Sequence, residues 1–147
     1  MSNVRLITDN SRKLKSALES LTDTALLVGV PSEYNLNHRT DSDMLNANLG
    51  YMFEFGEPSA GVPQRSFLIP GVKNAIPDTA HLLAIGAKNV LDLSGDPSKE
   101  LEQSFQIVGE YCVQRVQDYI DEISLYDTGQ LSQSMTYKLV PAKDIEK

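Results

Sequence analysis

The sequence predicts an α+β fold in which a small antiparallel sheet packs against several helices and long loops protrude. Over residues 97 to 123, apolar side chains recur every three or four positions, as on one face of a helix. A short apolar run at 25 to 30 is closed by Pro31, which is typical of a buried strand. Apolar and polar residues alternate over 135 to 139, which indicates a strand with one solvated face.

The chain of 147 residues is long enough for one compact domain, so residues 1 to 147 are expected to share a single core. Two mobile loops are predicted, at 31 to 43 and at 57 to 65. The first is rich in polar residues and the second contains two prolines, and neither has the apolar periodicity needed to order it by burial. The polar segment from 141 to 147 is predicted to be a flexible tail.

The N-terminal half contains signals for two helices and a strand. Asp9, Asn10 and Ser11 offer capping oxygens for a first helix, whose apolar face holds Leu14, Ala17, Leu18 and Leu21. The run at 25 to 30 is expected to be the central strand. A second helix is predicted to begin after Ser42 or Asp43 and to end at Gly56. Beyond the second loop, Phe67, Leu68 and Ile69 are expected to re-enter the core.

A third helix is predicted over residues 72 to 93, with Pro77 near its first turn. Gly86 inside it costs about 1 kcal/mol relative to alanine, and a close crossing with another backbone would compensate. Its predicted buried stripe consists of Ile76, Ala80, Leu83, Ala84, Ala87, Val90 and Leu91.

The fourth helix has the clearest pattern, with Asp96 as its cap and Pro97 at its first position. Its predicted buried stripe is Leu101, Phe105, Val108, Cys112, Val116, Tyr119 and Ile123, and polar residues occupy the opposite face. After it, Asp127 or Thr128 can cap a short turn that Gly129 completes, before the terminal strand.

Charge and composition restrict the classes of partner. With 20 acidic and 13 basic residues the formal charge is -7, which disfavours tight binding of nucleic acid. Cys112 is the only cysteine, so no intrachain disulfide is possible and no cluster of Cys and His has zinc-site spacing. No apolar segment long enough for a membrane span and no secretion signal occurs, so synthesis in a reducing cytoplasm is expected.

An enzymatic function is not expected. Homodimeric aspartic proteases share a proton between two Asp-Thr-Gly carboxylates, but here Asp127-Thr128-Gly129 follows a long helix and lacks the strand-rich body those enzymes need. His38 and His81 are too far apart in sequence and context to serve as metal ligands or as a base for Cys112. No catalytic, metal-binding or cofactor-binding residue is therefore predicted.

Glu54 and Arg65 flank the second loop, each beside aromatic or aliphatic anchors. An ion pair between them would close this loop and fix its direction of projection. In a solvated setting such a pair contributes only about 0 to 1 kcal/mol.

Two stretches stand out in the sequence. The first is Ala47-Asn-Leu-Gly-Tyr-Met-Phe-Glu-Phe-Gly56, followed by Val62-Pro-Gln-Arg-Ser-Phe-Leu68, and the second is Asp127-Thr-Gly-Gln-Leu-Ser-Gln-Ser134. Together they resemble the virion-morphogenesis and tail-completion (neck) proteins of tailed phages. They occur in the family's order. The chain departs from the family at Ser66, where proline is commoner, and in the long loop at 31 to 43.

This resemblance implies a virion protein of the head-tail junction, assembled in the bacterial host cytoplasm. Such a subunit forms a homo-oligomeric ring of six- or twelve-fold symmetry between portal and tail. Its partners would be other copies of itself and neck or tail proteins such as the adaptor, stopper, terminator or tube. DNA would only pass through the channel, and no membrane is involved. The interface and structural residues implied are Glu54, Phe55, Gly56, Pro63, Arg65, Phe67, Leu68, Asp127, Thr128, Gly129, Leu131 and Ser134.

Two alternatives remain open at this point. The chain could be a tail terminator that caps the tail tube, or a small binding module outside the virion, such as a helical adaptor. Genes for portal, capsid and tail tube beside this one would favour the hypothesis that the chain is a virion protein. Electron microscopy of the protein with isolated tails would show whether it caps their head-proximal end.

Overall fold

The computed structural model describes residues 9–32, 39, 43–93, 95–125 and 129–145. The prediction of an α+β fold is confirmed, because the described helices accompany a two-stranded antiparallel sheet. The elements in chain order are α1 (Ser11–Asp23), β1 (Thr24–Gly29), α3 (Asn46–Phe55), the 3-10 turn η1 (Pro58–Ala60), α4 (Leu68–Leu91), α5 (Pro97–Glu122), α6 (Gln130–Gln133), β2 (Thr136–Pro141) and the 3-10 turn η2 (Ala142–Asp144).

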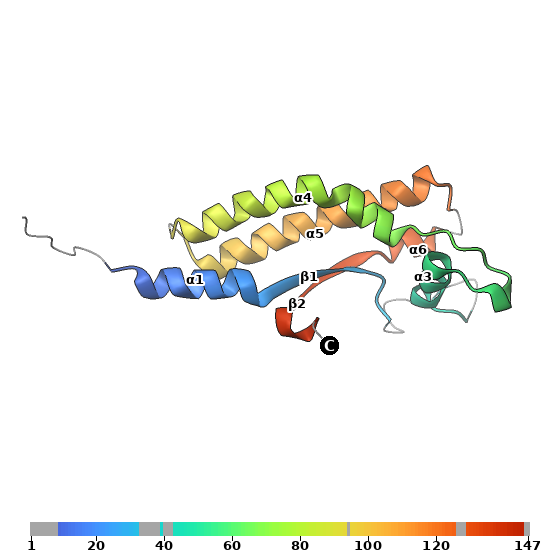
Figure 1. The fold of residues 1–147 in the computed structure, drawn as a ribbon, viewed down its shortest axis with the longest axis horizontal. Helices are drawn as coiled ribbons and strands as arrows, with labels where there is room; N and C mark the ends of the chain where they lie inside the picture. The colour runs from blue at the N-terminus through green and yellow to red at the C-terminus, as the bar shows by residue number, and fades with distance from the viewer. Residues whose placement is uncertain (1–8, 33–38, 40–42, 94, 126–128, 146–147) are drawn as a thin grey trace, which may run out of the picture.

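Helices α4 and α5 form a long antiparallel pair, with the sheet along one side of α5 (Figure 1). The two helices approach closely where α4 has glycine. A Cβ atom at Gly71 would lie 3.0 Å from the Cα of Val116, and one at Gly86 would collide with Ser104. The close crossing predicted at Gly86 is therefore confirmed. None of the described helices combines the length and hydrophobicity that crossing a membrane requires.

Strands β1 and β2 pair from Thr24 opposite Pro141 to Gly29 opposite Thr136. Alternation places Leu26 and Val28 against the helices, whereas Leu27 points outward and is 45% exposed. Both strands were predicted, but the expectation that β1 is a central strand is wrong. Within the described part of the chain it has a single partner, because only one other segment forms a strand.

Helix α5 organises the core. The side chain of Asp96 accepts a hydrogen bond from the N–H of Ser98 at 3.0 Å, and Pro97 begins the helix, as predicted. One side of α5 supplies residues to all three apolar clusters of the described structure, which is why its stripe was readable from the sequence. Its buried residues are Leu101, Phe105, Val108, Gly109, Cys112, Val116 and Ile120.

Helix α4 differs from its prediction in start and orientation. It begins at Leu68, so Pro77 lies inside the helix rather than in its first turn. The side turned to α5 carries small residues, among them Gly71, Ala75 and Gly86, because a close helix crossing has room for little else. Most of the predicted buried stripe is wrong, since Ile76 is 54% and Leu83 38% exposed and Ala80 and Ala84 are exposed as well. Only Val90 is fully buried, and Leu91 packs partly against the core.

Several boundaries also differ. Helix α1 buries only Ala17, and both Leu14 and Leu18 are exposed. Helix α3 ends at Gly56 as predicted, but Leu45 rather than Ser42 or Asp43 precedes its first residue. Ile69 does not enter the core, whereas Phe67 does.

The three segments predicted to be mobile have different outcomes. Most of the loop at 31 to 43 lies outside the described residues, although Arg39 is buried and donates to the Oδ1 of Asn46 at 2.8 Å. The segment at 57 to 65 is exposed and closed by backbone bonds between Glu57 and Val62. Regular structure continues to Asp144 through β2 and η2, so the predicted tail begins later than residue 141. The mobility of these segments stays a prediction.

Candidate functional site

The two motif stretches meet at one end of the molecule. Helices α3 and α6, with the turn η1 near them, lie at the end opposite to α1 (Figure 1). Phe67 and Leu131 belong to the same buried cluster, and both face Gly50 of α3. A Cβ atom at Gly50 would lie 3.3 Å from the Leu131 side chain and 3.4 Å from the Phe67 ring, so a larger residue there would require these side chains to shift.

Glu54 is buried at the centre of this end and caps the N-terminus of α4. Its carboxylate accepts bonds from the Ser66 hydroxyl at 2.6 Å and from the backbone N–H groups of Phe67, Leu68 and Ile69 at 2.9, 2.8 and 3.1 Å. The first N–H groups of a helix have no partner within the helix, and the positive end of the helix dipole favours an anion there. Glu54 therefore joins the end of α3 to the start of α4.

Two opposing effects act on the pKa of Glu54. Burial raises it, because the charged form loses hydration, but the four hydrogen bonds from Ser66, Phe67, Leu68 and Ile69 stabilise the carboxylate. The hydrogen bonds together have the larger effect, so the pKa of Glu54 lies below its ordinary value of 4.5. The group is a structural anion rather than an acid poised to donate a proton.

Arg65 caps the end of the antiparallel partner helix. Its guanidinium donates to the backbone oxygens of Ile123 at 2.8 Å and Ser124 at 3.3 Å, just beyond the last turn of α5. The ion pair predicted between Glu54 and Arg65 is wrong. The carboxylate binds the free N–H groups at the start of α4, and the guanidinium binds the free carbonyls at the end of α5. Each helix end offers several groups whose partial charge is opposite to that of the side chain.

The segment between these two residues is held against α3. The N–H of Arg65 donates to the carbonyl of Phe53 at 2.7 Å, and the Gln64 side chain donates to the carbonyl of Glu54 at 3.0 Å. Gly56 has a φ of 77°, and a Cβ atom there would lie 3.1 Å from the Gln64 nitrogen. Glycine is thus required for the chain to leave α3 and return beside it.

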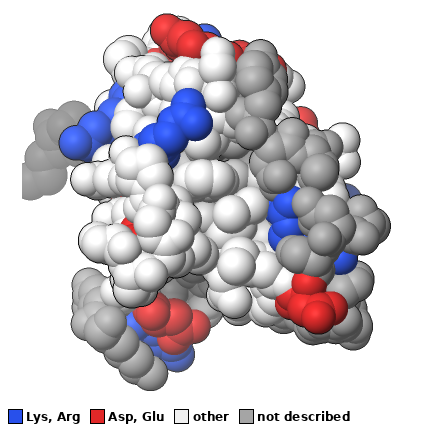
Figure 2. Space-filling model, turned by 90° about the vertical axis from the view of Figure 1, so that its right-hand side faces the viewer, with Lys and Arg blue, Asp and Glu red and all other residues white. Residues whose placement is uncertain are grey.

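An exposed aromatic pair stands beside the turn. Tyr51 and Phe55, one helical turn apart on α3, are 64% and 56% exposed, with ring centroids 4.8 Å apart. A shallow hollow next to Phe55 is lined by Gly56, Pro58, Gly61, Val62, Pro63 and Gln64. Viewed onto this end, the described surface is mostly uncharged, with charged side chains in a few separate spots (Figure 2).

The second motif stretch contributes α6 and its flanking residues to this end of the molecule. Gly129 has a φ of 84° and precedes α6, whose Leu131 is buried. The Ser134 hydroxyl donates to the Leu131 carbonyl at 2.7 Å, and the Gln117 side chain ties the Ser132 carbonyl to α5 at 2.8 Å. Asp127 and Thr128 lie outside the described residues, so their predicted capping role is not tested.

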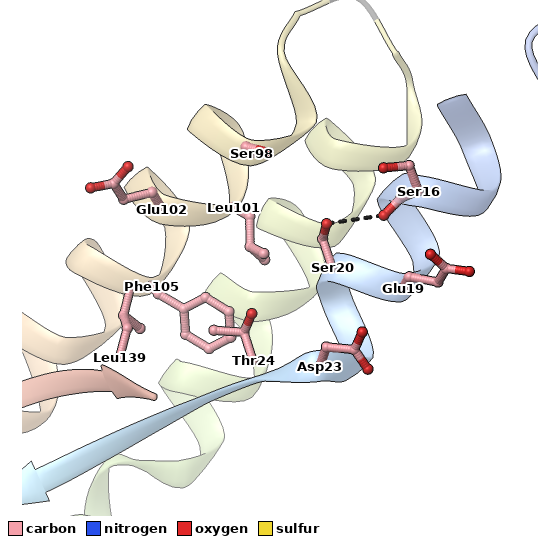
Figure 3. Close-up of a pocket in the computed structure, with 10 residues that line it drawn as sticks. All are labelled: Ser16, Glu19, Ser20, Asp23, Thr24, Ser98, Leu101, Glu102, Phe105 and Leu139. Carbon is pink, nitrogen blue, oxygen red and sulfur yellow. Dashed lines mark hydrogen bonds between the residues drawn. The ribbon is translucent and has the colours of Figure 1, made fainter. Parts of the chain in front are cut away.

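A groove at the other end of the molecule lies between α1, α5 and β2 (Figure 3). It has a volume of about 460 Å³, and Leu101 and Phe105 point into it. The carboxylates of Glu19 and Glu102 point away from one another, so they form neither an acid and base pair nor a shared cation site (Figure 3). Among the described residues no group of three His, Cys, Asp or Glu side chains could hold a metal ion.

The residues considered for catalysis are dispersed. His81 is exposed on α4, and His38 lies outside the described residues. Burial raises the pKa of the Cys112 thiol, which disfavours the reactive thiolate. Gly50 and Arg39 were not singled out from the sequence, and neither Ser66 as a partner of Glu54 nor Tyr51 as an exposed partner of Phe55 was predicted.

The comparisons with known proteins give no relatives. Neither protein-family models, nor curated proteins, nor solved structures match this chain.

Proposed function

We propose that this chain is a structural protein of a tailed bacteriophage, a neck or tail-completion subunit of the ring that joins the capsid to the tail. The proposal starts from the resemblance carried by the stretches at 47 to 68 and 127 to 134. The observation that supports it most is the convergence of these stretches at one end of the molecule, around Gly50, Phe67 and Leu131. Segments far apart in the sequence thus share one packed core at this end.

The surface chemistry of this end suits a protein partner. Exposed aromatic side chains such as Tyr51 and Phe55 give large contact areas with few rotatable bonds, and aromatic residues are enriched at the centres of interfaces. In the proposed ring, this end contacts a neighbouring copy or another neck or tail protein. A ring requires head-to-tail contacts that close by rotation, so each copy presents two different surfaces.

The Glu54 cap gives this end a fixed shape. Because its carboxylate joins α3 to α4 and Arg65 joins the turn to α5, the aromatic pair is presented on a frame tied to the two longest helices. A rigid contact surface loses little conformational entropy on binding. The net charge of -7 would also let DNA pass along the ring without sticking to it.

Particle composition tests the proposal directly. Purified virions from the host that carries this gene should contain the protein by mass spectrometry, and deletion of the gene should give filled heads separated from tails. Particles that lack the protein and assemble normally without the gene would overturn the proposal.

A surface variant tests the role of the aromatic pair. The double change Tyr51→Ser and Phe55→Ser should leave the melting temperature nearly unchanged, because both side chains are exposed, but should prevent complementation of the deletion. Ile107→Ser on α5 is the matched control, since Ile107 is 55% exposed and lies away from this end. If both variants complemented the deletion equally well, Tyr51 and Phe55 would not be part of the interface.

A further inference from the structure

Helix α4 carries an apolar row that the described fold leaves uncovered. Ile69, Ile76 and Leu83 follow one another at intervals of seven residues and are 45%, 54% and 38% exposed. Four residues after each of them, on the same flank, lie Lys73, Ala80 and Ala87, of which Ala87 is half-buried. These six residues, Ile69, Lys73, Ile76, Ala80, Leu83 and Ala87, are called the α4 row.

The row is separate from the side of α4 that packs on α5. With about 3.6 residues per turn, it lies roughly a third of a turn from the buried residues Gly71, Ala75, Thr79 and Gly86. Its only charged member is Lys73. A solvated helix flank is normally polar, so this pattern indicates a surface that another helix covers.

The seven-residue spacing specifies the kind of occupant. Large residues at every seventh position, with a second set four residues later, form the seam of two helices that pack nearly parallel to each other. The small side chains of Ala80 and Ala87 would let a second helix approach closely. The occupant is therefore expected to be an α-helix with a seam of matching spacing.

The α4 row is complementary to itself in an antiparallel arrangement. A two-fold axis near residue 78 places Ile69 opposite Ala87, Ile76 opposite Ala80, and Leu83 opposite the aliphatic stem of Lys73. Every large side chain then faces a small or flexible one, which is how facing layers interdigitate. A two-fold interface requires that residue i contacts j while j contacts i, and all three pairs satisfy this condition.

We infer that the free protein is a dimer in which the α4 rows of two copies pack antiparallel. The amine of Lys73 reaches solvent beyond the edge of the contact while its stem covers Leu83. This two-fold contact closes on itself and does not build a ring, which needs head-to-tail contacts. The dimer does not rest on the proposed function; for a virion component it would be the form before assembly.

Sedimentation of the full chain tests the inference. The parent protein should sediment as a dimer, and Ile76→Glu should weaken association at least about 100-fold, because each dimer loses two central apolar contacts. Ile85→Glu is the matched control, since Ile85 is 47% exposed on the same helix but outside the row. It should leave the dimer intact.

Disulfide trapping tests the direction of the pair. A mixture of Ile69→Cys and Ala87→Cys chains, one carrying a small tag, should cross-link under mild oxidation. Ile69→Cys alone should not, because the two copies of residue 69 lie about 27 Å apart in the antiparallel pair. The parent chain, whose Cys112 is buried, is the blank.

Four results would overturn the inference. These are a monomeric parent at all concentrations, equal effects of Ile76→Glu and Ile85→Glu, efficient cross-linking of Ile69→Cys with itself, or assembly directly into larger rings that Ile76→Glu does not disturb. Circular dichroism of each variant checks that the change has not unfolded the chain.

Discussion

The carboxylate of Glu54 accepts a hydrogen bond from the backbone N–H of Leu68 at 2.8 Å, across a gap of fourteen residues in the sequence. This bond and the two beside it, from Phe67 and Ile69, place an anion on the first turn of the helix that carries the α4 row. Glu54 thus links the helix that carries the aromatic pair to the helix that carries the α4 row.

Replacing this anion with an amide should weaken the fold. Glu54→Gln should lower the free energy of unfolding by about 2 to 4 kcal/mol, because the amide N–H₂ group would face the N–H donors of α4. Urea denaturation measures the effect. Glu102→Gln, at an exposed position on α5, is the control and should change stability by less than about 0.5 kcal/mol.

The cap should also make stability depend on pH. The pKa of Glu54 is lowered on folding, because the hydrogen bonds outweigh the effect of burial, so its contribution is fully present above the ordinary value of 4.5. The contribution is lost as the pH falls through the pKa of the folded state. The difference in melting temperature between the parent and Glu54→Gln should therefore be constant near neutrality and shrink below pH 4.5. A difference that grows on acidification would contradict this assignment.

Glu54 and Arg65 should act independently, because they bind the ends of different helices. Arg65→Ala should cost about 0.5 to 1.5 kcal/mol through loss of its bonds to the Ile123 and Ser124 carbonyls. In a double-mutant cycle with Glu54→Gln, the coupling energy should stay below about 0.5 kcal/mol. A coupling energy well above that value would indicate that Glu54 and Arg65 do form an ion pair, contrary to the structure.

Gly109 should tolerate no side chain. The ring of Tyr137 from β2 lies directly on this glycine, and a Cβ atom there would collide with it. Gly109→Ala should lower the free energy of unfolding by about 1 to 3 kcal/mol, despite the better helix propensity of alanine. Gly29→Ala is the control, since no atom lies within 4 Å of the added methyl, and thermal melting compares the two. If Gly109→Ala were as stable as the parent, Tyr137 would not be packed on α5.

The contacts of Glu54 and Arg65 show that sequence patterns do not reveal which distant residues a side chain will bind. Glu54 and Arg65 were singled out because they flank one turn, and both proved to be structural. The partner of Arg65 could not be predicted, because the free carbonyls at the end of α5 belong to residues far along the chain. Only the antiparallel packing of α4 and α5 brings Ile123 and Ser124 beside Arg65.

Elements with local signals could be predicted from the amino-acid order. Asp96 and Pro97 start α5, Gly56 ends α3, and alternation defines the strand after Met135, because capping, positive φ and side-chain direction depend on neighbouring residues. The buried flank of α4, in contrast, follows from how this helix packs on α5. Close packing on α5 selects the small residues Gly71, Ala75 and Gly86, whereas a hydrophobicity pattern favours Ile76 and Leu83. Local signals fix where a helix lies along the chain, but the shape of the partner helix decides which side it hides.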